Sequence, residues 1–242
     1  STNHSLDLSL KELSEIWMIH LEEHVPLQYL VGKCPWRDFE LEVNPSALIP
    51  RQETELLIDL ALKKFNPSIN KSGIWADLGT GSGALAISLA RLFPSWLGHA
   101  VDSSEEALSL AKKNIENLVD HSNLALHLGH WLEPLKPWWG KIDLVVANPP
   151  YIPKDNLKEL DPVVRDYEPQ LALCGGEDGM NACREIIQGS RHGLRSGGWL
   201  VFEHNFDQSE RALDFLKKSG FKEIDFSHDL EGIKRFAFGR NP

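Results

Sequence analysis

The chain has 242 residues, of which 42% are hydrophobic and 25% are charged, so it can bury the core of one large domain, with or without a small appendage. Its formal net charge of −10 argues against a broad surface for DNA or RNA, because affinity for phosphates comes chiefly from Lys and Arg. No segment resembles a membrane span or a secretory signal, and the three widely spaced cysteines lack zinc-ligand spacing, so we expect a soluble cytoplasmic protein without membrane contact or a metal.

The N-terminal segment is expected to form one helix and a short β-ribbon. Apolar residues recur every three to four positions, at Leu6, Leu10, Leu13, Trp17 and Leu21. This spacing predicts an amphipathic helix over residues 9–23. Phe39, Leu41 and Val43 alternate with glutamates, which is typical of a strand and predicts half of a small antiparallel ribbon.

From Ile74 onward, short apolar runs alternate with amphipathic stretches, which is typical of βαβ units and a parallel sheet. The predicted strands cover residues 74–78, 97–102, 124–128, 143–147, 199–203, 223–227 and 233–239. The predicted helices cover residues 56–65, 84–92, 104–118, 180–194 and 208–219. The last two strands have only a short connection, so we expect an antiparallel hairpin at the edge of the sheet. Residues 152–179 show no clear period, and their length marks them as a candidate lid or partner-binding element.

A glycine-rich turn follows the first of these strands and opens a helix. It consists of Asp77, Leu78, Gly79, Thr80, Gly81, Ser82 and Gly83. The third glycine comes one residue earlier than in the dinucleotide-binding spacing G-x-G-x-x-G. A pyrophosphate also prefers unpaired N–H groups and helix N-termini, whereas Asp77 brings a negative charge suited to an ammonium-bearing ligand. Adenosylmethionine carries an ammonium and no phosphate, so the turn favours it over a nicotinamide dinucleotide.

Two more residues at strand ends are candidates for holding an adenosyl group. Asp102 ends the second strand, where a carboxylate can accept hydrogen bonds from both ribose hydroxyls. Trp131 follows the third strand, at a rim where an adenine could stack. Each residue alone has a structural interpretation, as a helix cap or as part of the core. Taken in order with the glycine-rich turn and Asn148, however, they all fall at the carboxyl edge of the sheet, where open α/β folds bind ligands.

The segment Asn148-Pro149-Pro150-Tyr151 follows an apolar run and predicts a rigid platform at the tip of a buried strand. Two prolines fix φ near −65° and remove two backbone donors, so Asn148 and Pro149 should present carbonyl oxygens in fixed directions. These acceptors suit a substrate with an NH2 group, and Tyr151 could stack on its planar surface. The alternative is a proline-terminated strand followed by a loop.

Together these residues resemble the class I adenosylmethionine-dependent methyltransferases and, within them, the release-factor glutamine N5-methyltransferases. The resemblance covers nearly the whole chain and rests on residues 48–55, 77–83, 148–151, 164–173 and 175–180. The Asn-Pro-Pro-Tyr motif is shared with enzymes that methylate amino groups of DNA and ribosomal RNA, so residues 48–55 and 164–173 are the discriminating segments. The chain departs from the family pattern at Gln52, where proline is usual, and at Asn205, where glycine is usual.

The resemblance implies a Rossmann-like sheet of seven mostly parallel strands with an antiparallel edge hairpin. It also implies a truncated N-terminal helix and β-ribbon appendage over residues 1–50 and a methyltransferase domain over residues 51–242. The implied reaction is methyl transfer from S-adenosylmethionine to the side-chain amide N5 of the glutamine in the Gly-Gly-Gln motif of peptide chain release factors. Besides Asp77, the expected cofactor contacts are Gly79, Thr80, Gly81, Ser82, Gly83, Asp102, Trp131 and Asn148, and the expected glutamine contacts are Asn148, Pro149, Pro150 and Tyr151.

Asn148, Pro149 and Tyr151 are the expected catalytic residues, and they are expected to act mostly by positioning. If the Asn148 side-chain oxygen and the Pro149 carbonyl each accept an amide hydrogen, the nitrogen lone pair is directed at the methyl group. Three alternatives stay open at this point. One is an amino-methyltransferase acting on DNA, ribosomal RNA or another protein glutamine. The others are a nicotinamide dehydrogenase and a cofactor-binding protein without turnover.

Overall fold

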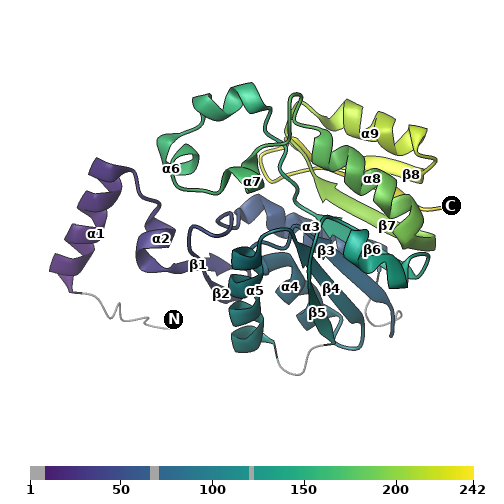
Figure 1. Cartoon of the computed structure of the whole chain (residues 1–242), viewed down its shortest axis with the longest axis horizontal. Helices are drawn as coiled ribbons and strands as arrows, with labels where there is room; N and C mark the ends of the chain where they lie inside the picture. The colour runs from purple at the N-terminus through teal and green to yellow at the C-terminus, as the bar shows by residue number, and fades with distance from the viewer. Residues whose placement is uncertain (1–8, 66–70, 120–122) are drawn as a thin grey trace.

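A seven-stranded sheet forms the centre of the computed structural model, which describes residues 9–65, 71–119 and 123–242 (Figure 1). Its strands are β3 (Ile74–Leu78), β4 (Leu97–Asp102), β5 (Leu124–Leu128), β6 (Ile142–Ala147), β7 (Leu194–Glu203), β8 (Lys222–His228) and β9 (Lys234–Arg240). They lie in the order β5-β4-β3-β6-β7-β9-β8. The first five are parallel, and β9 is antiparallel to both β7 and β8. The predicted fold class and its edge hairpin are confirmed.

The strand order reverses beside β3, and this reversal brings the ends of β3 and β6 together. The chain builds outward from β3 to β4 and β5, then returns to add β6 on the other side of β3. In the register of these two strands, Leu78 lies opposite Ala147. Gly79 and Asn148 are the next residues, so they leave the sheet side by side. Open α/β sheets bind ligands at such a switch point.

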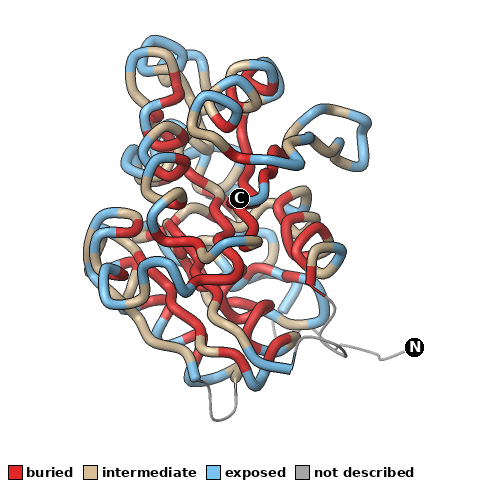
Figure 2. Tube along the Cα trace, turned by 90° about the vertical axis from the view of Figure 1, so that its right-hand side faces the viewer, coloured by how far each residue is buried: buried red, intermediate tan, exposed pale blue. Residues whose placement is uncertain are grey.

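Helices cover both faces of the sheet. On one face lie α3 (Glu55–Lys64), α4 (Ala84–Leu92) and α5 (Glu105–Leu118), and on the other lie α8 (Asn181–Gly193) and α9 (Ser209–Lys218). Side chains alternate between the two faces along each strand. Trp75 and Leu144 belong to the first core, whereas Ala76 and Val145 belong to the second. Figure 2 shows the result, a buried centre with exposed residues along the outer segments.

The N-terminal segment contains α1 (Leu10–Glu23), α2 (Leu27–Val31) and a ribbon of β1 (Lys33–Trp36) and β2 (Phe39–Glu42). The strands pair antiparallel, as the alternation of Phe39 and Leu41 with glutamates predicts. Trp36 and Leu41 are buried in the same core as α3 and α4. Asn114 of α5 also holds β2, because its side chain exchanges hydrogen bonds of 2.8 and 2.9 Å with the backbone of Glu42. The ribbon therefore packs directly against the sheet's own core.

Helix α1 forms where the apolar spacing predicts it, but the rest of the described chain does not cover its apolar face. Its start is fixed by a capping box between Ser9 and Glu12. No residue of α1 is buried, and 87% of Leu10 and 51% of Trp17 are exposed. Leu6, which extends the predicted apolar face, lies outside the described residues.

Residues 152–179 contain short elements that their sequence does not predict. These are the 3-10 helix η3 (Lys154–Glu159) and the helices α6 (Pro162–Arg165) and α7 (Gln170–Leu173). Each is too short to show a hydrophobic period. The same reason explains why α2 and the 3-10 helices η1 (Gln52–Thr54) and η2 (Glu133–Trp138) were not predicted.

Candidate active site

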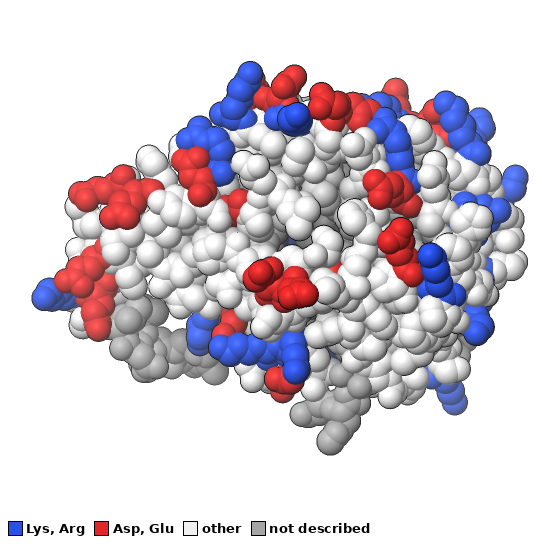
Figure 3. All heavy atoms as spheres, viewed as in Figure 1, with Lys and Arg blue, Asp and Glu red and all other residues white. Residues whose placement is uncertain are grey.

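A pocket of about 390 Å3 opens at the carboxyl edge of the sheet, where β3, β4 and β6 end. Its lining combines segments that are far apart in the sequence and includes Trp36, Ala47, Arg51, Thr54, Gly79, Asp102, Trp131, Asn148, Leu171 and Glu185. Figure 3 shows the same side of the molecule as Figure 1, where many charged side chains lie along the margin and acidic side chains also lie near the centre. The lining of the pocket itself is mostly apolar with a few polar groups, as is usual for a small-molecule ligand.

Most of the residues predicted to hold a cofactor meet in this pocket. Those in its lining are Gly79, Thr80, Gly81, Ser82, Asp102, Trp131 and Asn148. Asp77 and Gly83 lie outside the lining. Of the predicted glutamine contacts, Asn148 and Pro150 line the pocket, whereas Pro149 and Tyr151 do not.

The backbone of the glycine-rich turn is turned inward. The N–H groups of Gly79 and Thr80 donate to the carbonyl of Val101 at 2.9 and 3.0 Å, and that of Gly83 donates to Thr80. Gly83 is the N-cap of α4 and has a φ of +88°, a conformation that favours glycine. Because these donors are occupied inside the protein, the turn offers few of the free N–H groups that a pyrophosphate requires.

Asp102 is oriented by two backbone donors at the end of β4. Its Oδ2 accepts a hydrogen bond of 2.9 Å from the Gly81 N–H, and its Oδ1 accepts one of 3.0 Å from the Ser104 N–H. Each carboxylate oxygen can accept a further hydrogen bond. The side chain therefore serves both purposes weighed from the sequence, since it bridges two turns and also presents acceptors to the pocket.

Trp131 and Asp77 both contact the glycine-rich turn. Trp131 has an unusual φ of +44°, and its ring packs so close to Gly79 that a Cβ added there would lie 3.4 Å from the ring. Asp77 is fully buried and accepts a hydrogen bond of 2.7 Å from the Thr80 hydroxyl. Burial raises the pKa of Asp77 to about 7, and the Thr80 hydrogen bond counteracts part of that rise. Its predicted contact with an ammonium stays a prediction.

The Asn148 side chain is held by Thr54, which is not among the predicted site residues. Its Nδ2 donates to the Thr54 hydroxyl at 3.0 Å. That hydroxyl donates in turn to Oε2 of Glu203 at 2.6 Å, and the Tyr151 hydroxyl donates to the other oxygen, Oε1, at 3.1 Å. Glu203 is fully buried at the end of β7. A carboxylate that ends an apolar strand run is the sequence signal that could have identified it.

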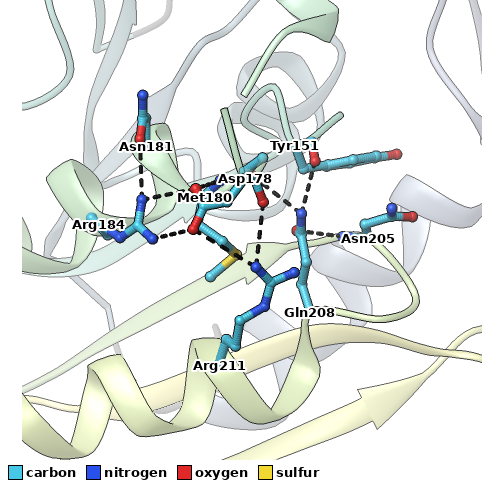
Figure 4. Close-up of polar contacts among 9 residues, drawn as sticks. Tyr151, Asp178, Met180, Asn181, Arg184, Asn205, Gln208 and Arg211 are labelled. Carbon is cyan, nitrogen blue, oxygen red and sulfur yellow. Dashed lines mark hydrogen bonds and ion pairs between the residues drawn. The ribbon is translucent and has the colours of Figure 1, made fainter. Parts of the chain in front are cut away.

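A second network holds the backbone just after the motif (Figure 4). The Gln208 side chain donates to the carbonyls of Tyr151 at 2.8 Å and Gly179 at 3.3 Å. Its oxygen accepts from the Asn205 N–H at 3.0 Å. Asp178 pairs with Arg184 and Arg211 beside it. These contacts tie the start and end of residues 152–179 to α8 and α9.

The middle of residues 152–179 is anchored by an ion pair with Arg51, which lines the pocket. Arg51 Nη2 lies 2.5 Å from Oε1 of Glu168, whose other oxygen accepts from the Ile49 N–H at 3.1 Å. The Glu168 side chain is almost fully buried. The pair joins the two segments on which the family resemblance depends most, residues 48–55 and 164–173.

The described residues also give two negative observations. Among residues 9–65, 71–119 and 123–242, no group of three or more His, Cys, Asp or Glu side chains is arranged to hold a metal ion. Over the same ranges, no helix is both long and apolar enough to span a membrane.

The strand order, the inward-turned glycine loop and the Asn148 motif beside it define a class I methyltransferase. Solved structures support this fold. A methyltransferase from Pyrococcus furiosus aligns over 96% of both chains with a TM-score of 0.59 and 16% identity. The precorrin-6y C5,15-methyltransferase of Geobacter metallireducens aligns over 83% of this chain and 93% of its own with a TM-score of 0.55 and 18% identity. The family model "Methyltransferase small domain" matches residues 52–163.

Sequence relatives define the family within this class. The release factor glutamine methyltransferase of Prochlorococcus marinus is 66% identical over all of this chain and 83% of its own length. That of Thermosynechococcus vestitus is 42% identical over 98% of this chain and 81% of its own length. The chain belongs to the release factor glutamine methyltransferase family and is a methyltransferase.

Proposed function

We propose that this chain transfers a methyl group from S-adenosylmethionine to the side-chain amide N5 of the glutamine in the Gly-Gly-Gln motif of peptide chain release factors. The observation that carries the proposal is the orientation of Asn148. Its Nδ2 is engaged by Thr54, which leaves its oxygen as the group available to a substrate that brings N–H donors. The names of the relatives supply the release factor and the glutamine.

The chemistry requires positioning more than a strong base. A glutamine amide nitrogen is a poor nucleophile because its lone pair is delocalised into the carbonyl. Acceptors at Asn148 and at the Pro149 carbonyl favour a pyramidal nitrogen with an exposed lone pair. Holding two reactants in line at near-attack distance can lower a bimolecular barrier by roughly 7 to 11 kcal/mol. The proton can leave after the transfer.

The pocket residues fit the adenosyl group and its substituents. When bound, S-adenosylmethionine supplies an electrophilic methyl group on a sulfonium. Asp102 is free to accept from two ribose hydroxyls, since its backbone partners occupy only one acceptor site on each oxygen. We propose that the adenine packs against Trp131. The turn from Gly79 to Ser82 would let the ligand approach the backbone closely.

The test is transfer of tritium from the labelled methyl group of S-adenosylmethionine to a release factor. We expect labelling of the factor with an intact Gly-Gly-Gln motif and none of the same factor with that glutamine changed to alanine. Equal labelling of both factors would contradict the proposal. So would labelling of ribosomal RNA or DNA in place of the factor.

A further inference from the structure

We infer that Glu203 is a positioning residue that, through the Thr54 hydroxyl, determines which edge of the Asn148 carboxamide faces the substrate. This inference rests on the proposed function and deepens it. Glu203 lies at the end of β7 and Thr54 at the start of α3, and neither belongs to the Asn148 motif.

Three side chains are linked by two successive hydrogen bonds. Asn148 Nδ2 lies 3.0 Å from Thr54 Oγ1, and Thr54 Oγ1 lies 2.6 Å from Glu203 Oε2. All three residues lie at the edge of the pocket or below it, since Asn148 and Thr54 line it and Glu203 is fully buried. The short distance to Glu203 is typical of a hydroxyl donating to a carboxylate.

The donor–acceptor direction of these two hydrogen bonds follows from the single hydrogen of the Thr54 hydroxyl. An ionised carboxylate can only accept, so Thr54 must donate its hydrogen to Glu203. The Thr54 oxygen can then only accept from Asn148. The Asn148 NH2 group is therefore held on the protein side, and its oxygen faces the substrate. A neutral Glu203 would carry its own hydrogen and would permit the reverse direction, with the NH2 group facing the substrate.

The burial of Glu203 places this reversal near neutral pH. Burial raises the pKa of Glu203 to about 7, against the lowering effect of the hydroxyl groups of Thr54 and Tyr151. Arg235 on β9 also lowers it, and Glu53 before α3 raises it. The ionised, substrate-accepting arrangement is thus favoured above about pH 7 and is lost as the pH falls below that value.

The chemical consequence is selectivity for a primary amide. An oxygen that faces the substrate accepts from the NH2 group of glutamine but repels the carboxylate of glutamate, which has no hydrogen to donate. A reversed Asn148 would lose this discrimination. Glu203 thereby controls the substrate class without touching the substrate.

The first test needs no substrate. Protein labelled with 15N at asparagine is titrated from pH 5.5 to 8.5, and the Asn148 side-chain NH2 signal is identified by its loss in Asn148→Ala. We expect this signal to shift with a midpoint near pH 7, and the shift to vanish in Glu203→Gln. The same titration retained in Glu203→Gln would overturn the inference, as would an Asn148 signal that does not change in the wild-type chain.

The second test separates the inference from the proposed function. With the release factor as substrate, Thr54→Val should lower kcat about tenfold, with the Kd of S-adenosylmethionine changed less than about threefold. Thr54→Ser keeps the hydroxyl and should restore most of kcat. Ser190→Ala removes a buried hydroxyl on α8 outside the pocket lining and serves as the control. Equal kcat values for Thr54→Val and the wild type would overturn the inference alone, whereas an inactive wild type would contradict the proposed function.

Discussion

Asn148 and Asp102 end two strands of the same sheet and carry different parts of the proposed reaction. Asp102 is oriented by backbone N–H groups and presents oxygens to the pocket, so we assign it to binding. Asn148 is oriented by a side chain and presents an acceptor where β6 leaves the sheet, so we assign it to the reacting amide. This division predicts opposite kinetic signatures for the two residues.

Replacing Asn148 by alanine should remove most of the turnover and little of the cofactor affinity. The lost acceptor acts on the reacting nitrogen, and removing one such preorganised group typically lowers kcat by about 100-fold. Turnover assays together with calorimetric titration of S-adenosylmethionine measure both quantities. Asn117→Ala on the exposed face of α5 is the control. Normal turnover of Asn148→Ala would refute the role assigned to this residue.

Replacing Asp102 by asparagine should mainly weaken the cofactor. A hydrogen bond to a carboxylate contributes roughly 1.5 to 3 kcal/mol, which corresponds to an increase in Kd of about 10- to 100-fold. Turnover at saturating cofactor should stay close to the wild-type value. The exposed Glu105, also at this end of the sheet, supplies the control Glu105→Gln. An unchanged Kd of the cofactor in Asp102→Asn would show that Asp102 does not bind it.

At the scale of elements, the pocket is assembled by contacts between segments that have little regular structure. Residues 152–179 are held at both ends by Gln208 and in the middle by the pair between Arg51 and Glu168. The expectation that these residues form a lid or partner-binding element stays a prediction. Their anchoring shows why short helices can hold a defined shape here, because buried polar contacts replace the missing hydrophobic period.

A histidine pair between β4 and β5 should make stability depend on pH. His99 is buried, its Nδ1 lies 2.9 Å from His127 Nε2, and Trp138 packs on its ring. Burial, together with the nearby His127, lowers the pKa of His99 to about 4. The unfolded chain therefore binds a proton more readily than the folded one below about pH 6.5, and the folded state loses stability as the pH falls toward 4.

The test compares the wild type with His99→Gln, which cannot be protonated in this range. Urea denaturation at several pH values gives the unfolding free energy of each protein. Below about pH 6.5, this free energy should fall more steeply for the wild type than for His99→Gln. For one titrating group, the difference in unfolding free energy between the two proteins can change by at most about 1.4 kcal/mol per pH unit. Parallel pH profiles for the two proteins would show that His99 is not responsible.

At the scale of the whole molecule, the N-terminal elements differ in how they join the core. The ribbon contributes Trp36 and Leu41 to the main core, whereas α1 buries none of its residues. In Figure 1, α1 stands at the opposite end of the molecule from α9. The proposed division of the chain at residue 50 stays a prediction, and stability measurements can test how much each element contributes.

A chain that starts at residue 26 should melt within about 2 °C of the full chain, because no residue of α1 is fully buried. Trp36→Ala in the full chain should instead lower Tm by on the order of 10 °C, since truncating a buried Trp costs about 3 to 5 kcal/mol. Calorimetry of both proteins checks the contrast. A large loss of Tm on removing α1 would mean that α1 is packed against the core in solution.

The sequence alone was sufficient to predict the sheet, its main helices and the glycine-rich turn between β3 and α4. Period-two and helical spacings are local, and they identify elements such as β6 and α5 within a few residues. The glycine-rich turn is equally local, because its conformation requires glycine at specific positions. Only the tertiary structure revealed that Glu203 holds Thr54, 149 positions away, and that Arg51 meets Glu168. Strand order decides which distant side chains become neighbours, and hydrophobic spacing does not encode strand order.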